Sequence, residues 1–350
     1  MNEPTHRLSN IDVLRGAAAF SVCIFHFSRN HFLGVGGVEQ IAQEGYLGVD
    51  AFFVISGFVI PLALWKAQFN PSQFAHFLFA RLLRLYPAFL AAAVSTILLW
   101  YGSSLAPGFK GSAPHFTLHG LITNATLTCD VFGDEWLVPV FWTLAIEAQY
   151  YIVIALTFPL IVSPKPVVRF ATLASWMGVP LVCSWKAALF PYCGLFVLGI
   201  LVFSQSFGFL SKKSGAAFAA FALGVQCLSG GFASAIVGGC SYCFILYTPE
   251  IKIAPLIALG SVSYSLYLLH VPIGGRVINL SARWGASMGC KITAFCVALS
   301  FSLLAASVLF TWIEKPAHKL SRGWWVKRPN QYLKATAQAK TAAIGGVSER

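Results

Sequence analysis

Charged residues are scarce in this sequence. Asp, Glu, Lys and Arg make up 10% of the 350 residues, whereas an ordinary soluble domain carries about 25%. Hydrophobic residues make up 57%, and the mean hydropathy is +0.72. A soluble core cannot account for this surplus, and the apolar segments recur from one end of the chain to the other. The composition therefore argues against a soluble protein and predicts one membrane domain.

The apolar segments also lack the alternation of apolar and polar residues that strands of a membrane barrel would have. A spanning helix needs about 20 mostly apolar residues. We therefore expect an all-α fold, a polytopic transmembrane helical bundle of about ten spans. The predicted spans are 11–29, 46–65, 82–101, 138–162, 167–185, 188–206, 214–231, 233–249, 256–275 and 291–313.

Positive charges are unevenly distributed between the two ends of these spans. Lys and Arg concentrate in loops that face the cytoplasm. With the N-terminus placed inside, 17 of the 24 Lys and Arg residues fall on the cytoplasmic side and 6 outside, while Arg15 lies within the first helix. We therefore expect both termini to be cytoplasmic. The net charge of +12 is then mainly a topology signal, and we expect no nucleic-acid partner.

The expected membrane domain covers residues 1–320, and residues 321–350 are expected to be a basic, disordered tail held against membrane lipid. Arg15 and His26 interrupt the first apolar run, and no small-residue cleavage site follows it, so we expect no signal-peptide cleavage. No His/Cys cluster has the spacing of a zinc site, so we expect no metal ion. The long outer loop, 102–137, either grips an external substrate or only covers the bundle.

Ionisable residues inside the predicted spans indicate a functional site, because they are costly to bury there. Arg15 and His26 are eleven residues apart, which places them about 20° apart on one helix face and about 16 Å apart along the axis. Asp50 lies four or five residues into the next span, at a depth close to that of His26. A carboxylate beside an imidazole fixes its tautomer and raises its basicity. We therefore expect His26 and Asp50 at the reactive centre.

Two arginines lie three residues apart at the cytoplasmic end of the third span. Arg81 and Arg84 share a helix face, and such a pair suits phosphate. Anchoring at the membrane interface is the alternative, and it is favoured on the pair alone. In the fourth span, Glu147 lies well inside the membrane with no charged neighbour in sequence, and a buried carboxylate needs partners.

The ionisable residues divide into two groups by predicted depth. Arg15, Arg81 and Arg84 lie near the cytoplasmic side, and His26, Asp50, Glu147 and His270 toward the outer half. An extended acyl-CoA arm reaches about 15–20 Å, comparable with the helical rise between Arg15 and His26. Ser56 and Tyr264 add polar groups at intermediate positions, and Gly57 allows another backbone or a thin ligand to approach.

Six motifs follow one another along the chain. They are IDVLRGAAAFSVCIFHF, GVDAFFVISGF, RLLRLYP, FWTLAIEAQYY, SYSLYLLH and WIEKP. Together, over about residues 8–320, they resemble the acyltransferase 3 family of integral-membrane acyltransferases. Members of that family O-acylate cell-surface sugars, including lipopolysaccharide O-antigen, exopolysaccharide, peptidoglycan and nodulation factors. Some carry an extra C-terminal hydrolase-like domain, which we do not expect here because the chain ends shortly after WIEKP.

The resemblance implies an O-acyltransferase of the cell inner membrane. Such an enzyme would move an acyl group, expected to be acetyl, from acetyl-CoA to a hydroxyl of a surface glycan or lipid-linked sugar. His26, Asp50 and Glu147 are then the expected catalytic residues. The expected CoA-binding residues are Arg15, Arg81 and Arg84, and the expected acceptor-binding residues are His270, Tyr264 and Ser56. His26 would act either as a base or as a transient acetyl carrier, and the sequence leaves both roles open.

A proton-coupled or anion transporter is the alternative function. Buried His, Asp, Glu and Arg residues also suit proton relays. No internal repeat is visible, which counts against the inverted-repeat transporters. Acetylation of a glycan by the purified protein would distinguish the two functions.

Overall fold

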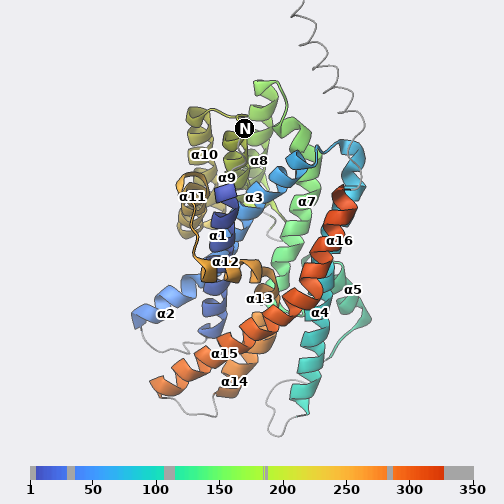
Figure 1. Cartoon of the computed structure of the whole chain (residues 1–350), viewed down its shortest axis with the longest axis vertical. Coiled ribbons are helices and arrows are strands. Elements are labelled where there is room, and N and C mark those ends of the chain that lie inside the picture. Colours follow the sequence, from blue (N-terminus) through green and yellow to red (C-terminus); the bar gives the residue numbers. More distant parts are fainter. Residues whose placement is uncertain are drawn as a thin grey trace, which may run out of the picture.

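The computed structural model describes residues 5–29, 36–105, 115–183, 185, 188–281 and 287–326, and these residues form helices and no strand (Figure 1). The first half contains α1 (Thr5–Phe27), α2 (Gly36–Gln43), η2 (Glu44–Leu47), α3 (Gly48–Lys66), η3 (Pro71–Gln73), α4 (Phe74–Ser104), α5 (Leu118–Ala125), α6 (Cys129–Phe132), η4 (Pro139–Phe141), α7 (Trp142–Ile161) and α8 (Pro166–Val182). The second half contains η5 (Phe190–Tyr192), α9 (Cys193–Ser206), α10 (Lys212–Gly230), α11 (Phe232–Tyr247), α12 (Ala254–Ser261), α13 (Ser263–Leu269), η6 (His270–Gly275), α14 (Arg276–Ser281), α15 (Met288–Leu309), η7 (Phe310–Glu314) and α16 (Lys315–Val326). The predicted all-α class is confirmed for these residues.

The predicted count of ten spans is not confirmed. Within the described residues, the helical stretches long and apolar enough to cross a membrane are Ser9–Phe27, Gly36–Lys66, Pro71–Ser104, Pro139–Ile161 and Met288–Trp325. A further pair, Ala254–Ser261 and Ser263–Ser281, qualifies only as one span bent by 57°. The apolar helices α8, η5–α9 and α11 coincide with predicted segments but are shorter. The apolar segments of the sequence predict where these helices lie. They do not show which helices are long enough to cross a membrane.

Close backbone contacts hold the centre of the bundle together. α3 crosses α9, which is buried along most of its length. A Cβ atom on Gly57 would lie 2.2 Å from the carbonyl oxygen of Phe196, and one on Gly199 would lie 2.1 Å from that of Val54. Only glycine fits such a crossing. The prediction that Gly57 admits another backbone is therefore confirmed, and that backbone belongs to α9.

α1 is fixed by a similar contact on its other side. A Cβ atom on Gly260 of α12 would lie 1.9 Å from the carbonyl oxygen of Asp12. α1 also packs against α3 and α13. The helix that carries Arg15 and His26 is thus held between neighbours over its length, which fixes the positions of both side chains.

Two π-helical segments interrupt the C-terminal helices. The segment η6 begins at His270, and η7 ends at Glu314. π-Helical turns often occur at functional sites, and each of these segments carries an ionisable residue that is buried. The predicted ninth span is therefore a broken helix, bent between α12 and α13 and wound as a π-helix after Leu269.

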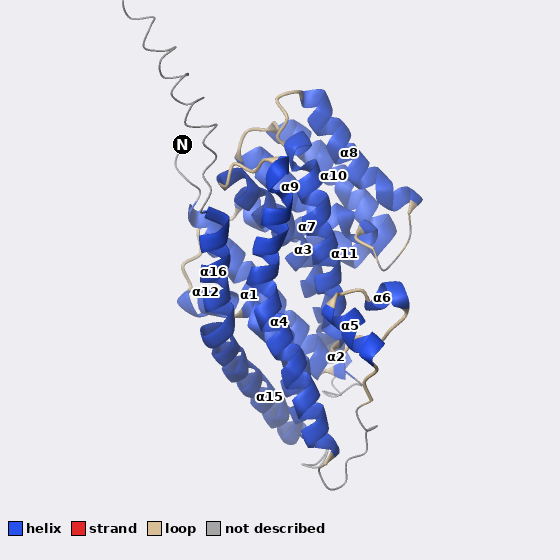
Figure 2. Cartoon of the chain, turned by 90° about the vertical axis from the view of Figure 1, so that its right-hand side faces the viewer, coloured by secondary structure: helices blue, strands red, loops and turns tan. Residues whose placement is uncertain are grey.

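α1 begins and α16 ends toward the same end of the molecule (Figure 2). The tenth span was predicted to end at residue 313. The helix that starts as α15 instead continues through η7 into α16 up to Val326. The predicted tail, 321–350, therefore begins inside a helix. Residues 327–350 lie outside the described part of the chain.

Part of the long loop 102–137 folds into a cap made of α5 and α6. The Asn124 side chain donates a hydrogen bond to the carbonyl oxygen of Glu135 (3.0 Å) and accepts one from the backbone N–H of Leu137 (2.8 Å). The Asp134 carboxylate accepts from the Thr123 hydroxyl at 2.6 Å and contacts Nδ1 of His119 at 2.9 Å. The Thr123 hydrogen bond, followed by the His119 contact, lowers the pKa of Asp134. Residues 106–114 lie outside the described part of this loop.

Candidate functional site

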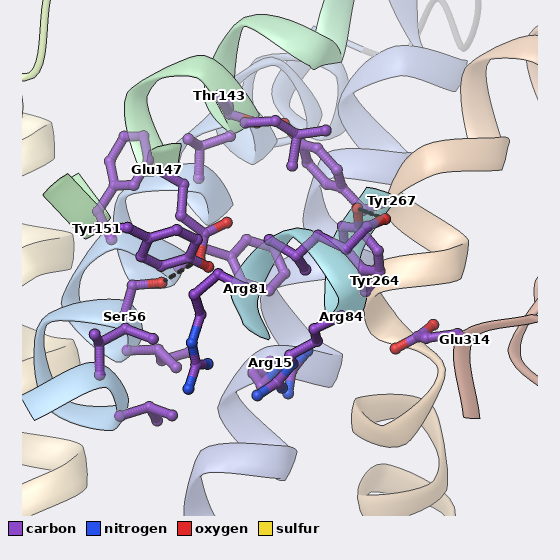
Figure 3. Close-up of a pocket in the computed structure, with 18 of the residues that line it drawn as sticks. Arg15, Ser56, Arg81, Arg84, Thr143, Glu147, Tyr151, Tyr264, Tyr267 and Glu314 are labelled. Atoms are coloured by element: carbon purple, nitrogen blue, oxygen red, sulfur yellow. Dashed lines mark hydrogen bonds between the residues drawn. The ribbon is translucent and has the colours of Figure 1, made fainter. Parts of the chain in front are cut away.

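One cavity, here called the arginine cavity, has a volume of about 110 Å³ and is enclosed by α1, α3, α4, α7, α13 and the η7–α16 segment. Arg15 comes from α1, and Arg81 and Arg84 come from one face of α4, as their spacing predicts. In Figure 3 these three side chains gather at one end of the cavity, while Thr143 and Tyr267 lie at the other. The cavity is therefore cationic at one end and carries hydroxyl groups at the other.

The three guanidinium groups have no carboxylate to neutralise them directly. Within the described residues, none of the three makes an ion pair or a hydrogen bond. Arg81 is only 8% exposed, and its Nε is buried without a partner. Its guanidinium lies 5.2 Å from the centre of the Phe77 ring and 6.0 Å from that of Tyr151. A buried cation without a partner is costly, so this end of the cavity is suited to an anion.

The two carboxylates of the arginine cavity are bonded to hydroxyl groups instead. Glu147 accepts hydrogen bonds from Ser56 at 3.1 Å and from Tyr151 at 2.6 Å. Glu314 accepts from Ser265 at 2.5 Å, and its other oxygen lies 3.5 Å from Nε2 of His318. Both carboxylates therefore moderate the positive charge of the cavity without pairing with an arginine.

A second, smaller space adjoins the arginine cavity. This vestibule, of about 60 Å³, is lined by Arg81, Arg84, His318, Ser321, Arg322 and Trp325. The first three residues line both spaces. The positive charge thus continues from the arginine cavity to the exposed Arg322 on α16.

The histidine cavity is larger, about 660 Å³, and is lined by the end of α1 together with η2, α3, η4, α7, α8, η5, α10, α11 and α13. His26 and Asp50 both line it. Its walls carry the aromatic rings of Phe25, Tyr46, Trp142, Tyr192 and Tyr267, together with the polar side chains of Gln226, Ser229 and Ser234. Small-molecule sites commonly have about 300–1,000 Å³ and combine such apolar walls with a few polar groups.

The tautomer of His26 is fixed by a backbone carbonyl and a second histidine. Nδ1 of His26 lies 2.9 Å from the carbonyl oxygen of Val22 and 3.2 Å from Nε2 of His270. Nδ1 of His270 lies 3.1 Å from the carbonyl oxygen of Leu266 and must donate to it, so its Nε2 is an acceptor. Nδ1 of His26 therefore carries its proton. Nε2 of His26 is left with a free lone pair in the histidine cavity.

Asp50 does not orient His26. Within the described residues the two side chains share a cavity but no hydrogen bond, and Asp50 interacts with Ser234, which lines the same cavity. Ser234 in turn accepts a hydrogen bond from Gln226 at 3.0 Å. Asp50 lies in the first turn of α3, next to α11, and this packing turns it toward Ser234. The expected tautomer control comes from His270 and Val22 instead.

The structure redistributes the other predicted site residues between the two cavities. Glu147, predicted at the depth of His26, lines the arginine cavity, and so do Ser56 and Tyr264. The Tyr264 hydroxyl donates to the carbonyl oxygen of Leu85 at 3.1 Å. His270 is fully buried and reaches the histidine cavity only through His26.

Several residues of the site were not predicted. They are Thr143, Tyr151, Gln226, Ser234, Tyr267, Glu314 and His318. Glu314 belongs to the WIEKP motif and Tyr267 to SYSLYLLH, so both motifs carried a usable signal. Gln226 and Ser234 lie in ordinary apolar segments and gave no such signal. Cys240 and Cys243 have Cys-x-x-Cys spacing but are exposed on α11, away from both cavities.

Comparison with known proteins gives three kinds of result. A sequence model of the acyltransferase domain family, Acyl_transf_3, matches residues 8–313. The chain is similar to a putative peptidoglycan O-acetyltransferase of Bacillus subtilis, with 31% identity over 42% of this chain and 23% of the relative. An O-acetyltransferase of Staphylococcus aureus is 31% identical over 45% of this chain and 25% of the relative. A peptidoglycan O-acetyltransferase of Listeria monocytogenes is 28% identical over 41% and 23%. The matches thus span about a quarter of the length of these relatives, and no solved structure matches the chain.

Proposed function

Because the chain belongs to the acyltransferase 3 family, we propose that it is a membrane O-acyltransferase that moves an acetyl group from acetyl-CoA to a hydroxyl of a glycan. One observation supports this most strongly. Three unpaired guanidinium groups line a cavity that shares Val49 and Tyr267 with the cavity of His26. An anionic donor on one side and a neutral acceptor on the other would meet near a basic imidazole.

The arginine cavity suits the phosphate-bearing donor. Arg15, Arg81 and Arg84 present guanidinium donors to a single space, and arginine forms strong charge-assisted hydrogen bonds with phosphate. The buried Nε of Arg81 has no partner in the described residues, and a phosphate oxygen would supply one. A bound donor would contribute the reactive thioester, and the arginines would hold the phosphates away from His26.

The histidine cavity suits the acceptor. Its volume of about 660 Å³ has room for a sugar, and its aromatic rings offer apolar faces. Asp50, Ser234 and Gln226 form a polar group on one wall that would bind sugar hydroxyls. The relatives from Bacillus and Listeria are named for peptidoglycan, so a cell-surface or exported glycan, free or as a lipid-linked sugar, is the acceptor class that we propose. Lipopolysaccharide belongs to the same class.

His26 carries the chemistry in this proposal. Its Nε2 takes the proton of the acceptor hydroxyl, and the hydroxyl oxygen forms a bond to the thioester carbonyl carbon. The carbon–sulfur bond then breaks, and His26 returns the proton to the departing sulfur. His270 holds His26 in the required tautomer through the 3.2 Å contact. Glu147 holds Ser56 and Tyr151 in place and limits the positive charge around the donor.

The proposal includes an orientation in the membrane. We place the arginine cavity toward the cytoplasm, where acetyl-CoA is made, and the histidine cavity toward the outside of a bacterial inner membrane. Charge asymmetry supports this placement, since most Lys and Arg residues then lie inside.

The test is acetyl transfer by purified protein in lipid nanodiscs, supplied with acetyl-CoA and glycan acceptors. We expect release of free CoA together with a mass increase of one acetyl group on the acceptor. Mass spectrometry of surface glycans from cells with and without the protein would then identify the natural acceptor. Movement of a solute with no change in any glycan would instead favour a transporter and overturn the proposal.

A further inference from the structure

The arginine and histidine cavities meet at a wall of two residues. Val49 and Tyr267 line both spaces, and no other described residue does. Val49 comes from the first turn of α3, and Tyr267 comes from α13. The two spaces therefore adjoin at these two side chains, which a group reaching from the arginines toward His26 would contact.

Tyr267 is held firmly in this wall. Its hydroxyl lies 2.9 Å from that of Thr143 and donates to the carbonyl oxygen of Val140 at 3.3 Å. The ring is 6% exposed and its centre lies 5.8 Å from the ring centres of both Phe52 and His270. Tyr267 therefore packs against the His270–His26 pair, and its hydrogen bonds and burial leave it little freedom to move.

Val49 is the smaller and less constrained half of the wall. Its side chain is partly buried, makes no polar contact, and ends in two methyl groups. It lies next in sequence to Asp50, on the helix that also contributes Ser56 to the arginine cavity. A change in volume at this position alters the width of the passage without removing a hydrogen bond.

We infer that Val49 and Tyr267 form the slot that holds the transferred acyl group and that they limit its length to a short chain. The inference rests on the proposed function. With the donor phosphates at the arginine end (Figure 3), the thioester reaches His26 only across this wall. The acyl chain then lies against the Val49 methyl groups and the Tyr267 ring. One methylene in an apolar pocket changes relative rates by about 10–200-fold, so a valine-sized boundary is sufficient to select acetyl.

The experiment compares Val49→Ala, Val49→Ile and Val59→Ala with the parent protein. Val59 is the matched control, because it is a valine of the same helix that lines only the arginine cavity. Transfer is measured with acetyl-, propionyl- and butyryl-CoA. Binding is measured separately, with S-ethyl-, S-propyl- and S-butyl-CoA thioethers, which cannot transfer a group.

We expect Val49→Ala to lower the preference for acetyl over butyryl by at least about 10-fold and Val49→Ile to raise it. The thioether affinities should change with chain length in the same order. Val59→Ala should affect all chain lengths alike and leave the preference within about twofold of the parent. The inference fails if the parent transfers acetyl but Val49 variants keep its preference, or if Val59→Ala shifts the preference equally. If the parent transfers no acyl group from any donor, the proposed function fails as well.

Discussion

The two cavities differ in the kind of group that each leaves without a partner. The arginine cavity holds three guanidinium groups that no described carboxylate pairs with, in a space of about 110 Å³. The histidine cavity holds one imidazole nitrogen without a partner, in a space of about 660 Å³ with aromatic walls. In the function that we propose, the first binds the anionic donor, and the second binds a larger, mostly neutral acceptor beside His26. The proposed function therefore assigns donor binding to one cavity and chemistry to the other.

The largest expected effect is on the rate of acetyl transfer, without a change in the affinity for acetyl-CoA. His26→Ala removes the only Nε2 base that we place in the histidine cavity, and loss of a positioned general base costs about 10²–10⁴-fold in rate. The affinity for acetyl-CoA should stay close to that of the parent, because His26 does not line the arginine cavity. Transfer rate and CoA binding are measured at matched protein amounts. His119→Ala, in the cap outside both cavities, should leave both quantities unchanged.

A large effect on binding is expected at the arginines. Arg84→Glu places a negative charge where we propose donor phosphate, and loss of one partner of a buried charge pair costs about 2–5 kcal/mol. The dissociation constant for acetyl-CoA should rise about 30-fold or more, and Arg84→Gln should give a smaller rise. Lys319→Glu changes an exposed cation of α16 and should have little effect. Unchanged binding in both Arg84 variants would leave membrane anchoring as the better explanation of the pair.

A moderate effect is expected at Asp50. Its carboxylate interacts with Ser234 and has no hydrogen bond to His26. Asp50→Asn should therefore raise KM for the acceptor by about 10-fold, the value of one charge-assisted hydrogen bond to the acceptor, and lower kcat less. Ser234→Ala should have a similar but weaker effect on KM. KM and kcat are measured with a soluble acceptor. A loss of kcat as large as that of His26→Ala, with KM unchanged, would restore Asp50 as the partner of the imidazole.

The smallest effect is expected in the cap, which belongs to neither cavity. The pKa of Asp134 is lower in the folded protein than its ordinary value of 3.8, chiefly because Thr123 donates to it. The carboxylate therefore binds a proton more readily in the unfolded chain than in the folded protein. The hydrogen bond from Thr123 to Asp134 stabilises the cap fully above the ordinary pKa, and this stabilisation is lost as the pH falls through the pKa of the folded protein. The contribution of Asp134 to cap stability should be constant above about pH 5 and should fall below about pH 4.

Limited proteolysis of the cap across this pH range checks that prediction. Asp134→Asn should weaken the cap at neutral pH and remove most of the acid dependence. Glu135→Gln, which alters an exposed neighbouring carboxylate, should behave like the parent. Equal acid sensitivity in the parent and in Asp134→Asn would show that another group controls the cap.

The sequence predicted features that are set within a single helix, such as which side chains share a face. It did not predict contacts that depend on how two helices are rotated relative to each other. The shared face of Arg81 and Arg84 and the close approach at Gly57 follow from local spacing and residue size, and both are present. The partner of Asp50 depends on the rotation of α3 against α11, which no periodicity specifies. Glu147 was placed by counting from the end of its span, and that count does not show which cavity its face of α7 meets.

Depth counting also assumes straight helices of standard pitch. The 57° bend between α12 and α13 and the π-helical turn at His270 alter the position of every residue that follows. Similarly, the helix through Glu314 runs on to Val326, so Glu314 lies inside the bundle and not at its surface. Motif membership would have identified Glu314 as a site residue, whereas hydropathy could not.

In the reaction that we propose, donor and acceptor approach His26 from opposite sides of the membrane. Sealed membrane vesicles test this arrangement when they are supplied externally with labelled acetyl-CoA, which does not cross the bilayer. Everted vesicles, which expose the cytoplasmic face, should label the enclosed glycan, and right-side-out vesicles should label it only after they are made permeable. Equal labelling by both intact preparations would contradict this arrangement, because the donor would then reach His26 from the acceptor side.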